Sequence, residues 1–240
     1  LQSVIYLKKL WPRLAIATTP GFTGHNWMSK SGSPPPLTVG DGGAHVLEGD
    51  QCLVFFLGGM RQPGSTTPNV ALIGFSPNRE YPMSVLVQSA TRKGPYYPFQ
   101  SSRLAVHPRV GNPVLPTRSQ GFASYMDGYE KRPYLYFSSR SFGASTATTV
   151  VRGYAAADCS GACDDAAMQL EVQVAGYYTT PYVDPSGLPF ARDAFQILCA
   201  GRDNRFGPGG TYSQAVGAPQ GFIADDMANF HPALMGSGTQ

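Results

Sequence analysis

Charge is scarce in this chain of 240 residues: Asp, Glu, Lys and Arg make up 14% of it, against about 25% in an average soluble domain. The basic residues stand singly or in pairs rather than in a stripe, which argues against a nucleic-acid-binding surface. Long apolar runs are also missing. The longest covers residues 52–57, far short of the roughly 20 residues that a membrane helix needs. We therefore expect neither a nucleic-acid partner nor a membrane span within these residues.

The common sequence templates of catalysis are absent as well. The chain has no Gly-x-Ser-x-Gly, His-Glu-x-x-His or Walker A sequence, and the Gly-rich stretch 207–210 lacks the following Lys and Ser or Thr that hold a phosphate. Isolated Ser, His and Asp residues are more often turn or cap residues than members of a triad. The sequence therefore predicts a protein that is not an enzyme.

Glycine and proline are abundant, with 28 and 21 residues, while 42% of the chain is hydrophobic. This composition predicts a packed core connected by many loops. The longest predicted surface loop covers residues 18–43, where the sequence Ser33-Pro34-Pro35-Pro36 favours extended backbone.

Two segments have a helical signal. Residues 1–11 contain no Gly or Pro and place Leu1, Val4, Ile5 and Leu7 on one face, and Pro12 predicts the end of this helix. Because no N-cap residue precedes Leu1, we expect these residues to be the last turns of a longer helix. The apolar run 52–57 fits either a buried strand or a short buried helix, for which Asp50 offers an N-cap.

Four short segments, rich in aromatic and β-branched residues, are bounded by Gly, Pro or Ser. They cover residues 82–87, 98–106, 132–138 and 195–199, and they predict an antiparallel sheet.

The four cysteines allow one local disulfide. Cys159 and Cys163 are separated by three residues in a loop that contains Gly161, and we expect them to be bridged in an oxidising compartment. Cys52 and Cys199 each lie in an apolar run, where a buried thiol and a cross-link between core elements are both possible. No His is near a Cys in the sequence, so a zinc site is not expected.

Hard oxygen donors are concentrated near the C-terminus. Asp203 lies in the Gly-rich stretch 201–210, and Asp225 and Asp226 follow 15 residues later. Calcium is bound by six to eight oxygens from carboxylates and loop carbonyls, at about 2.3–2.6 Å. The alternative is purely structural: Asp203-Asn204 makes a good turn, and Asp225 could cap a following short helix.

The same stretch resembles the C-terminal calcium loop of the major (G-type) pseudopilins of type II secretion. Three runs carry the resemblance, in the order found in that family: a strand ending in Cys199-Ala200-Gly201-Arg202-Asp203-Asn204, a Gly209-Gly210 turn, and a closing Ala224-Asp225-Asp226-Met227-Ala228-Asn229-Phe230. The upstream runs 47–59, 74–76 and 133–139 resemble those of a broad group of bacterial proteins with a prepilin-type N-terminal cleavage and methylation segment.

This resemblance implies a pilin-like α+β fold, in which a long N-terminal helix packs on an antiparallel sheet of a globular head with long loops. Residues 1–12 would be the distal end of this helical spine, here truncated, and residues 13–240 the head, with the calcium-loop-like region at 199–230. The implied function is that of a structural subunit of a type IV pilus-like or type II secretion pseudopilus-like filament.

The family also implies partners and a location. The partners would be further copies of the chain in a helical filament, the inner-membrane assembly machinery and a prepilin peptidase. The protein would be anchored in the membrane before assembly and would then form a filament outside the cell, at the cell surface or in the periplasm.

Carried over by position, Asp203 matches the aspartate of the family's calcium loop and Asp226 the aspartate that closes it. The main-chain carbonyl of Arg205 falls where the family uses a backbone oxygen, and Asp225 could assist or replace Asp226. Cys199 stands where the family often has a serine hydroxyl, and sulfur is a poor calcium ligand. Asn204 replaces a glycine, which is tolerable because Asn enters the left-handed region readily.

A second function remains open, that of a secreted surface-adhesive or glycan-binding module. The tyrosine pairs Tyr96-Tyr97 and Tyr177-Tyr178 lie in loop-rich stretches and could form such a site if they are exposed. Paired tyrosines are, however, more often half-buried strand residues.

Overall fold

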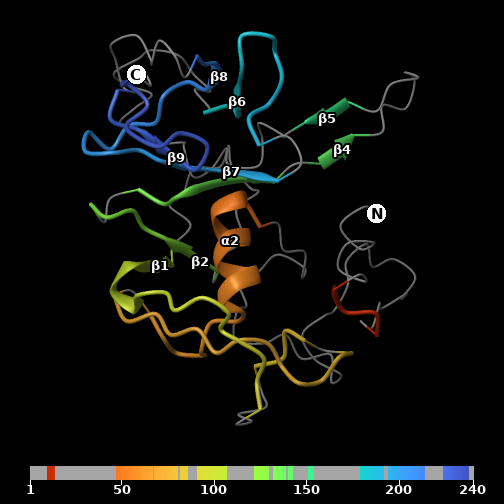
Figure 1. Ribbon diagram of the computed structural model, residues 1–240. Coiled ribbons are helices and arrows are strands. Elements are labelled where there is room, and N and C mark those ends of the chain that lie inside the picture. Colours follow the sequence, from red (N-terminus) through yellow and green to blue (C-terminus); the bar gives the residue numbers. More distant parts are fainter. Residues whose placement is uncertain are drawn as a thin grey trace, which may run out of the picture. The chain divides into compact units, whose positions relative to one another are not determined.

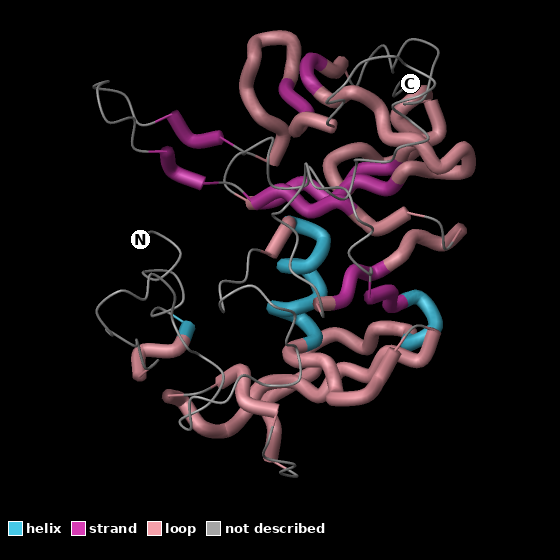
Figure 2. Tube along the Cα trace, turned by 180° about the vertical axis from the view of Figure 1, so that it is seen from behind, coloured by secondary structure: helices cyan, strands magenta, loops and turns pink. Residues whose placement is uncertain are grey.

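The computed structural model describes residues 10–13, 47–66, 68–80, 82–85, 91–106, 122–129, 132–138, 140–142, 151–153, 179–191, 194–213 and 224–237. Much of this described chain is loop, as Figure 2 shows. Its main elements, most of which are labelled in Figure 1, are α2 (Gly49–Gly58), the 3-10 helix η1 (Ser101–Arg103), β1 (Leu104–Val106), β2 (Ala123–Tyr125), β3 (Leu135–Ser138), β4 (Arg140–Phe142), β5 (Val151–Gly153), β6 (Tyr182–Val183), β7 (Phe195–Cys199), β8 (Gly210–Thr211) and β9 (Met227–Ala228). The arrangement belongs to the α+β class.

The chain forms two compact units. Unit 1 comprises Leu1–Leu47 and Val54–Ala123, and unit 2 comprises Glu48–Leu53 and Ser124–Gln240. Each unit has its own cluster of buried hydrophobic side chains. The predicted division into a spine end at 1–12 and a head at 13–240 stays a prediction. Within the described residues, no helix has both the length and the apolar character needed to cross a bilayer.

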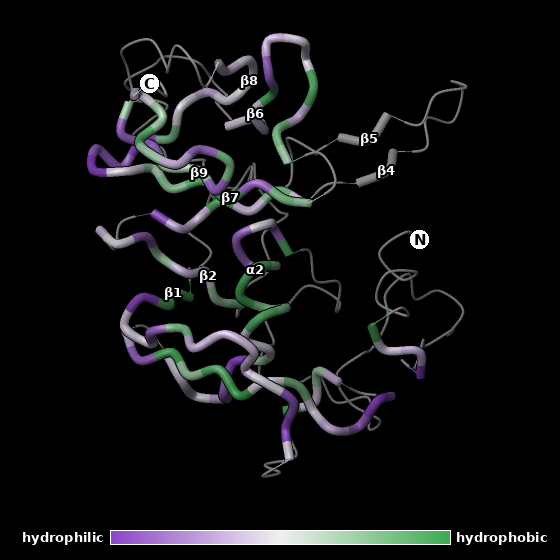
Figure 3. Tube along the Cα trace, viewed as in Figure 1, coloured by the Kyte–Doolittle hydropathy of each residue, from purple (hydrophilic) through white to green (hydrophobic). Residues whose placement is uncertain are grey.

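Helix α2 resolves the ambiguity of the apolar run 52–57 in favour of a helix. The run is preceded by polar residues, and Figure 3 shows the helix changing from hydrophilic to hydrophobic along its length. The predicted N-cap is wrong: the helix begins at Gly49, so Asp50 lies in its first turn. Asp50 is buried and accepts a hydrogen bond of 2.5 Å from the Ser124 hydroxyl, so its carboxylate serves a tertiary contact instead of capping.

The core of unit 1 is aromatic. The ring of Phe55 packs edge-on against those of Phe75 and Phe122, with centroids 5.2 and 5.8 Å apart, and Trp11 packs against Phe75 at 5.1 Å. Leu10 is helical and a turn follows at Pro12. The helix therefore ends where the sequence predicted, just before the proline.

A three-stranded antiparallel sheet with the order β3-β7-β9 organises unit 2. Strand β7 coincides with the predicted segment 195–199, and β3 lies inside the predicted segment 132–138. Of the other predicted segments, 98–106 contains β1, whereas residues 82–85 form turn and irregular backbone. The remaining pairs are β1-β2, an antiparallel β4-β5 and a parallel β6-β8.

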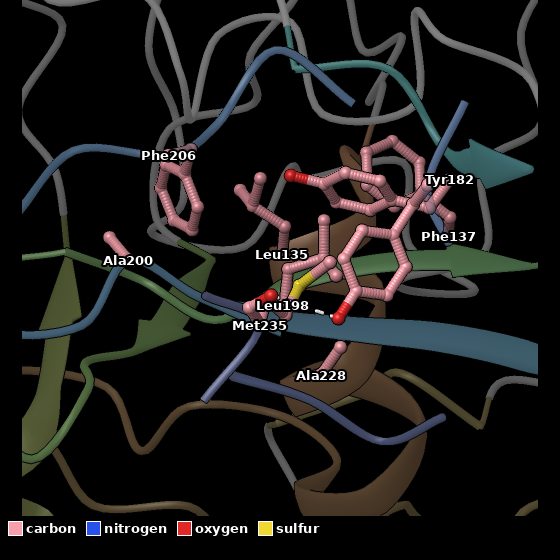
Figure 4. Packing of buried hydrophobic residues seen from close by; sticks show 9 residues of the cluster. Leu135, Phe137, Tyr182, Leu198, Ala200, Phe206, Ala228 and Met235 are labelled. Atoms are coloured by element: carbon pink, nitrogen blue, oxygen red, sulfur yellow. Dashed lines mark hydrogen bonds between the residues drawn. The ribbon is translucent and has the colours of Figure 1, made fainter. Parts of the chain in front are cut away.

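Buried side chains from the strands and loops cover one face of this sheet. Figure 4 shows Leu135 and Leu198 in the middle of the cluster, with the rings of Phe206 and Tyr182 at opposite ends. The fully buried Gln196 ties the loop 182–190 to β7, because its amide accepts from Tyr182 N at 2.9 Å and donates to the carbonyls of Tyr182 and Phe190 at 2.9 and 3.0 Å. This holds the segments around the C-terminal loop in place.

We expect Gln196→Leu to lower the free energy of unfolding by about 2 kcal/mol, because the substitution leaves buried backbone groups without partners. Chemical denaturation would measure the loss. The exposed Gln100→Leu is the matched control, and an equal effect of both substitutions would contradict the role assigned to Gln196.

Candidate metal centre

The chain turns sharply where β7 ends. Residues 201–204 form this turn, in which Gly201 and Asn204 both have left-handed backbone, with φ of 66° and 64°. The predicted tolerance of Asn204 for this conformation is confirmed. Within the turn, the exposed Asp203 accepts a hydrogen bond of 2.8 Å from Arg205 N through Oδ1.

Asp225 joins the turn to the segment that precedes β9. Its Oδ2 accepts hydrogen bonds from the backbone N–H groups of Arg202 and Asp203. Gly201 allows this approach, since a Cβ there would lie 2.3 Å from the carbonyl oxygen of Asp225. The structural alternative, in which Asp225 caps a following helix, is wrong: a strand, β9, follows, and Asp225 satisfies the N–H groups of the opposite turn.

Asp226 is buried, with 1% of its surface exposed. Its Oδ2 accepts a hydrogen bond of 2.8 Å from Gly207 N, on the far side of the turn. Its Oδ1 is also buried and has no hydrogen-bond partner among the described residues. A buried carboxylate oxygen without a partner is costly and is normally compensated by a proton or a cation.

The electrostatics of the three aspartates agree with this cost. Burial raises the pKa of Asp226 to about 8; the Gly207 N–H opposes the rise, and repulsion from Asp225 and Asp203 adds to it. The pKa of Asp203, although the residue is exposed, is also raised, first by partial removal of its carboxylate from water and then by repulsion from Asp225, against the hydrogen bond from Arg205 N. Repulsion between carboxylates thus adds to the effect of burial at Asp203 and at Asp226.

These residues fit a cation only in part. Asp203, Asp225 and Asp226 come from two segments of the chain, and each has at least one oxygen committed to a backbone N–H. Among the residues that the structure describes, no group of three or more His, Cys, Asp or Glu side chains is arranged to hold a metal ion. The calcium ligands, including the Arg205 carbonyl, stay a prediction, and the unpartnered Oδ1 of Asp226 is the feature that fits one best.

The sequence identified Asn204 as a turn residue and as a replacement for glycine, but not as a candidate ligand. Its Oδ1 is buried without a hydrogen-bond partner, and its main-chain carbonyl accepts a hydrogen bond of 3.0 Å from Arg132 Nε. An amide oxygen is a hard donor, so residue type was the signal that could have placed Asn204 among the candidate ligands.

The cysteines are only partly described. Cys52 and Cys199, the two that the structure describes, form no disulfide, and Cys199 is buried in β7 opposite Met227. Cys159 and Cys163 lie outside the described residues, so their predicted bridge stays a prediction.

Comparison with known proteins gives no relative for this site: no family model, no curated protein and no solved structure matches the chain.

Proposed function

We propose that this chain is a structural subunit of a type IV pilus-like or type II secretion pseudopilus-like filament and not an enzyme. The proposal rests on the resemblance of the C-terminal stretch to the pseudopilin calcium loop, and on one structural observation. The buried carboxylate of Asp226 accepts a hydrogen bond from Gly207 N, three residues beyond the turn that follows β7, and has one oxygen without a partner among the described residues.

In this proposal Asp203, Asp225, Asp226 and the Arg205 carbonyl hold a calcium ion. The ion would neutralise carboxylates that repel one another and satisfy the buried oxygen of Asp226. The chain's own contribution is to connect three segments: the turn after β7, the Gly207 loop, and the segment entering β9, where Met235 N donates to the Asp226 carbonyl at 2.9 Å. A preformed C-terminal surface would then be available to a neighbouring subunit.

The function would be mechanical. An apolar helical spine would supply the association energy, prepilin peptidase and the inner-membrane machinery would process and assemble the subunits, and the filament would extend into the periplasm or from the cell surface. The aromatic-rich, weakly charged composition suits lateral contacts, because interface cores are depleted of charge and enriched in aromatic residues.

Asp226→Ala tests the link between this loop and assembly. In cells that produce the protein, we expect it to reduce the amount of the chain in the sheared surface fraction at least about tenfold, since an unformed loop removes one contact surface. The matched control is Asp127→Ala, which removes another buried aspartate of unit 2, one that accepts from Tyr129 N. Equal amounts of Asp226→Ala and unaltered protein in that fraction would contradict the proposal.

A secreted adhesive or glycan-binding module is the second candidate. Tyr96 and Tyr97 have 64% and 46% of their surface exposed, as such a site requires, whereas Tyr177 and Tyr178 lie outside the described residues. Soluble monomers that bind a glycan array and lose binding with Tyr96→Ala would favour this function over the filament.

A further inference from the structure

Unit 1 exposes a tyrosine patch, which consists of Phe56, Leu57, Tyr96 and Tyr97. Between 37% and 64% of each side chain is exposed. The first pair lies at the end of α2 and the second in a later loop. The two pairs are tied together because Tyr96 N and Tyr97 N both donate to the Leu57 carbonyl, at 2.7 and 3.2 Å. Large apolar side chains that gather on a surface in this way mark a contact with a partner.

The rings of the tyrosine patch are held by neighbouring aromatic side chains. Phe56 packs edge-on against the buried Phe55, with ring centroids 5.1 Å apart, and Tyr97 packs against Phe99 at 4.7 Å. Side chains that are already fixed lose little conformational freedom on binding. The patch is therefore preorganised for a partner that accepts aromatic rings.

Basic side chains dominate the surface of unit 1. Among its described residues, Glu80 is the one acidic side chain that is exposed or half-buried, against six basic ones: Arg13, Arg61, Arg79, Arg92, Lys93 and Arg103. Over the whole sequence of the unit, eleven Lys and Arg residues stand against two Asp and Glu residues, a formal charge of +9. Lys93 is exposed and precedes Tyr96 by three residues, so the patch and the positive charge belong to the same unit and meet at this loop.

Two of these basic side chains contribute charge and have little left to bind a particular group. Arg92 donates to backbone carbonyls through Nε, Nη1 and Nη2, and Arg61 donates to the Ser65 carbonyl through Nη1. A nucleic acid is held by Lys and Arg side chains that contact individual phosphates. A positive potential around an apolar patch instead suits a partner whose negative charge is spread over a surface.

We propose that unit 1 docks on the surface of an anionic phospholipid membrane through the tyrosine patch. Tyrosine rings favour the level of the lipid headgroups, and Phe and Leu side chains enter the boundary with the acyl chains. Negatively charged headgroups attract the excess of basic side chains. The docking involves unit 1 alone and does not depend on the filament proposed above.

A glycan and a second copy of the chain fit this surface less well. A sugar-binding site places polar groups beside its aromatic rings, whereas Phe56 and Leu57 adjoin the two tyrosines here. A second copy that presented the same patch would bring together two surfaces that both carry an excess of basic side chains, and like charges oppose such a contact.

Co-sedimentation of the purified chain with lipid vesicles tests the docking. The vesicles would consist of phosphatidylcholine alone or of phosphatidylcholine with about one third phosphatidylglycerol, with chelator present so that no metal ion bridges protein and lipid. Lys93→Gln removes an exposed charge beside the patch, and Tyr96→Ser removes its most exposed ring. Arg202→Gln and Tyr129→Ser are the matched controls, because they remove an exposed charge and an exposed ring from unit 2. Thermal melts would establish that every variant is folded.

We expect the chain to bind the anionic vesicles, to bind the neutral vesicles at least about tenfold more weakly, and to be released by salt. Lys93→Gln should raise the apparent dissociation constant about fivefold and Tyr96→Ser about tenfold, while both controls leave it within about twofold. No binding to the anionic vesicles, equal binding to both kinds of vesicle, or equal effects of the patch variants and their controls would overturn the inference.

The same variants would reveal another occupant of the patch. Binding to a single-stranded oligonucleotide or to a glycan array that Lys93→Gln and Tyr96→Ser weaken, while vesicle binding is unchanged, would overturn the inference in favour of that ligand. Self-association in sedimentation velocity that Tyr96→Ser abolishes, again with unchanged vesicle binding, would overturn it in favour of a second copy.

The outcome is distinct from that of the proposed function. Filaments on producing cells, together with no binding to anionic vesicles, would leave the filament standing and remove the membrane contact. Binding to anionic vesicles through the patch, without filaments on cells, would do the reverse.

Discussion

Calcium-free protein should become less stable as the pH rises from about 4 to about 8, the opposite of the usual behaviour of a buried aspartate that is paired. The pKa of Asp226 is 3.8 in an unfolded chain and about 8 in the folded protein, chiefly because of burial. The folded state therefore binds this proton more tightly. The stability that the proton contributes is complete below pH 3.8 and is lost as the pH rises through about 8.

The size of this loss of stability follows from the difference between the folded and unfolded pKa of Asp226. Linkage gives a loss of at most about 5 kcal/mol in the free energy of unfolding across that pH range. Thermal melts of chelator-treated protein at a series of pH values would measure it. Asp226→Asn, which is neutral at every pH, should flatten the profile, and an unchanged slope in this variant would contradict the role of Asp226.

Calcium should reverse the trend. Because the ion competes with the proton for Asp226, its stabilising effect should be largest at pH 8 and above and should diminish towards pH 5. If neither chelator nor calcium changes the melting temperature at pH 8, the proposed calcium site is contradicted.

Gly201→Ala should be one of the most damaging single changes in the chain, with a loss of about 4 kcal/mol in the free energy of unfolding. The glycine has a φ of 66°, and a Cβ would lie 2.3 Å from the Asp225 carbonyl oxygen and 2.7 Å from its Oδ2. The clash is with backbone, so no side-chain rotation relieves it. The turn after β7 would have to move away from Asp225, and the three aspartates would separate.

Gly210→Ala provides the matched control. Gly210 has a φ of 81°, but nothing lies within 4 Å of its added Cβ, so the substitution isolates the backbone cost of about 1 kcal/mol. Denaturation of both variants, with and without calcium, would measure the difference. Equal losses would show that the approach of Asp225 to Gly201 contributes nothing.

Elements whose ends are marked by nearby glycine or proline residues were predicted correctly from the sequence. Strand β7 was predicted at its observed bounds because its apolar residues end at a glycine turn, and Pro12 marked a helix end. The run 52–57 was ambiguous because six apolar residues fit either element, and Asp50 was misassigned as the N-cap because its carboxylate is bound by Ser124 inside the fold. A partner 74 residues away leaves no local signal.

The candidate site was predicted by residue type and missed in its details. Strand β9 has two residues and exists through its pairing with β7, so the local pattern at Asp225 suggested a helix cap. The burial of Asp226 depends on chain from several segments, which a pattern cannot reveal.

Immunogold electron microscopy of producing cells tests the central claim most directly, with an antibody raised against the purified chain and the Asp226→Ala strain beside the unaltered one. We predict gold labels along filaments in the unaltered strain and few labelled filaments in the variant. Label confined to soluble or evenly dispersed protein in both strains would contradict it.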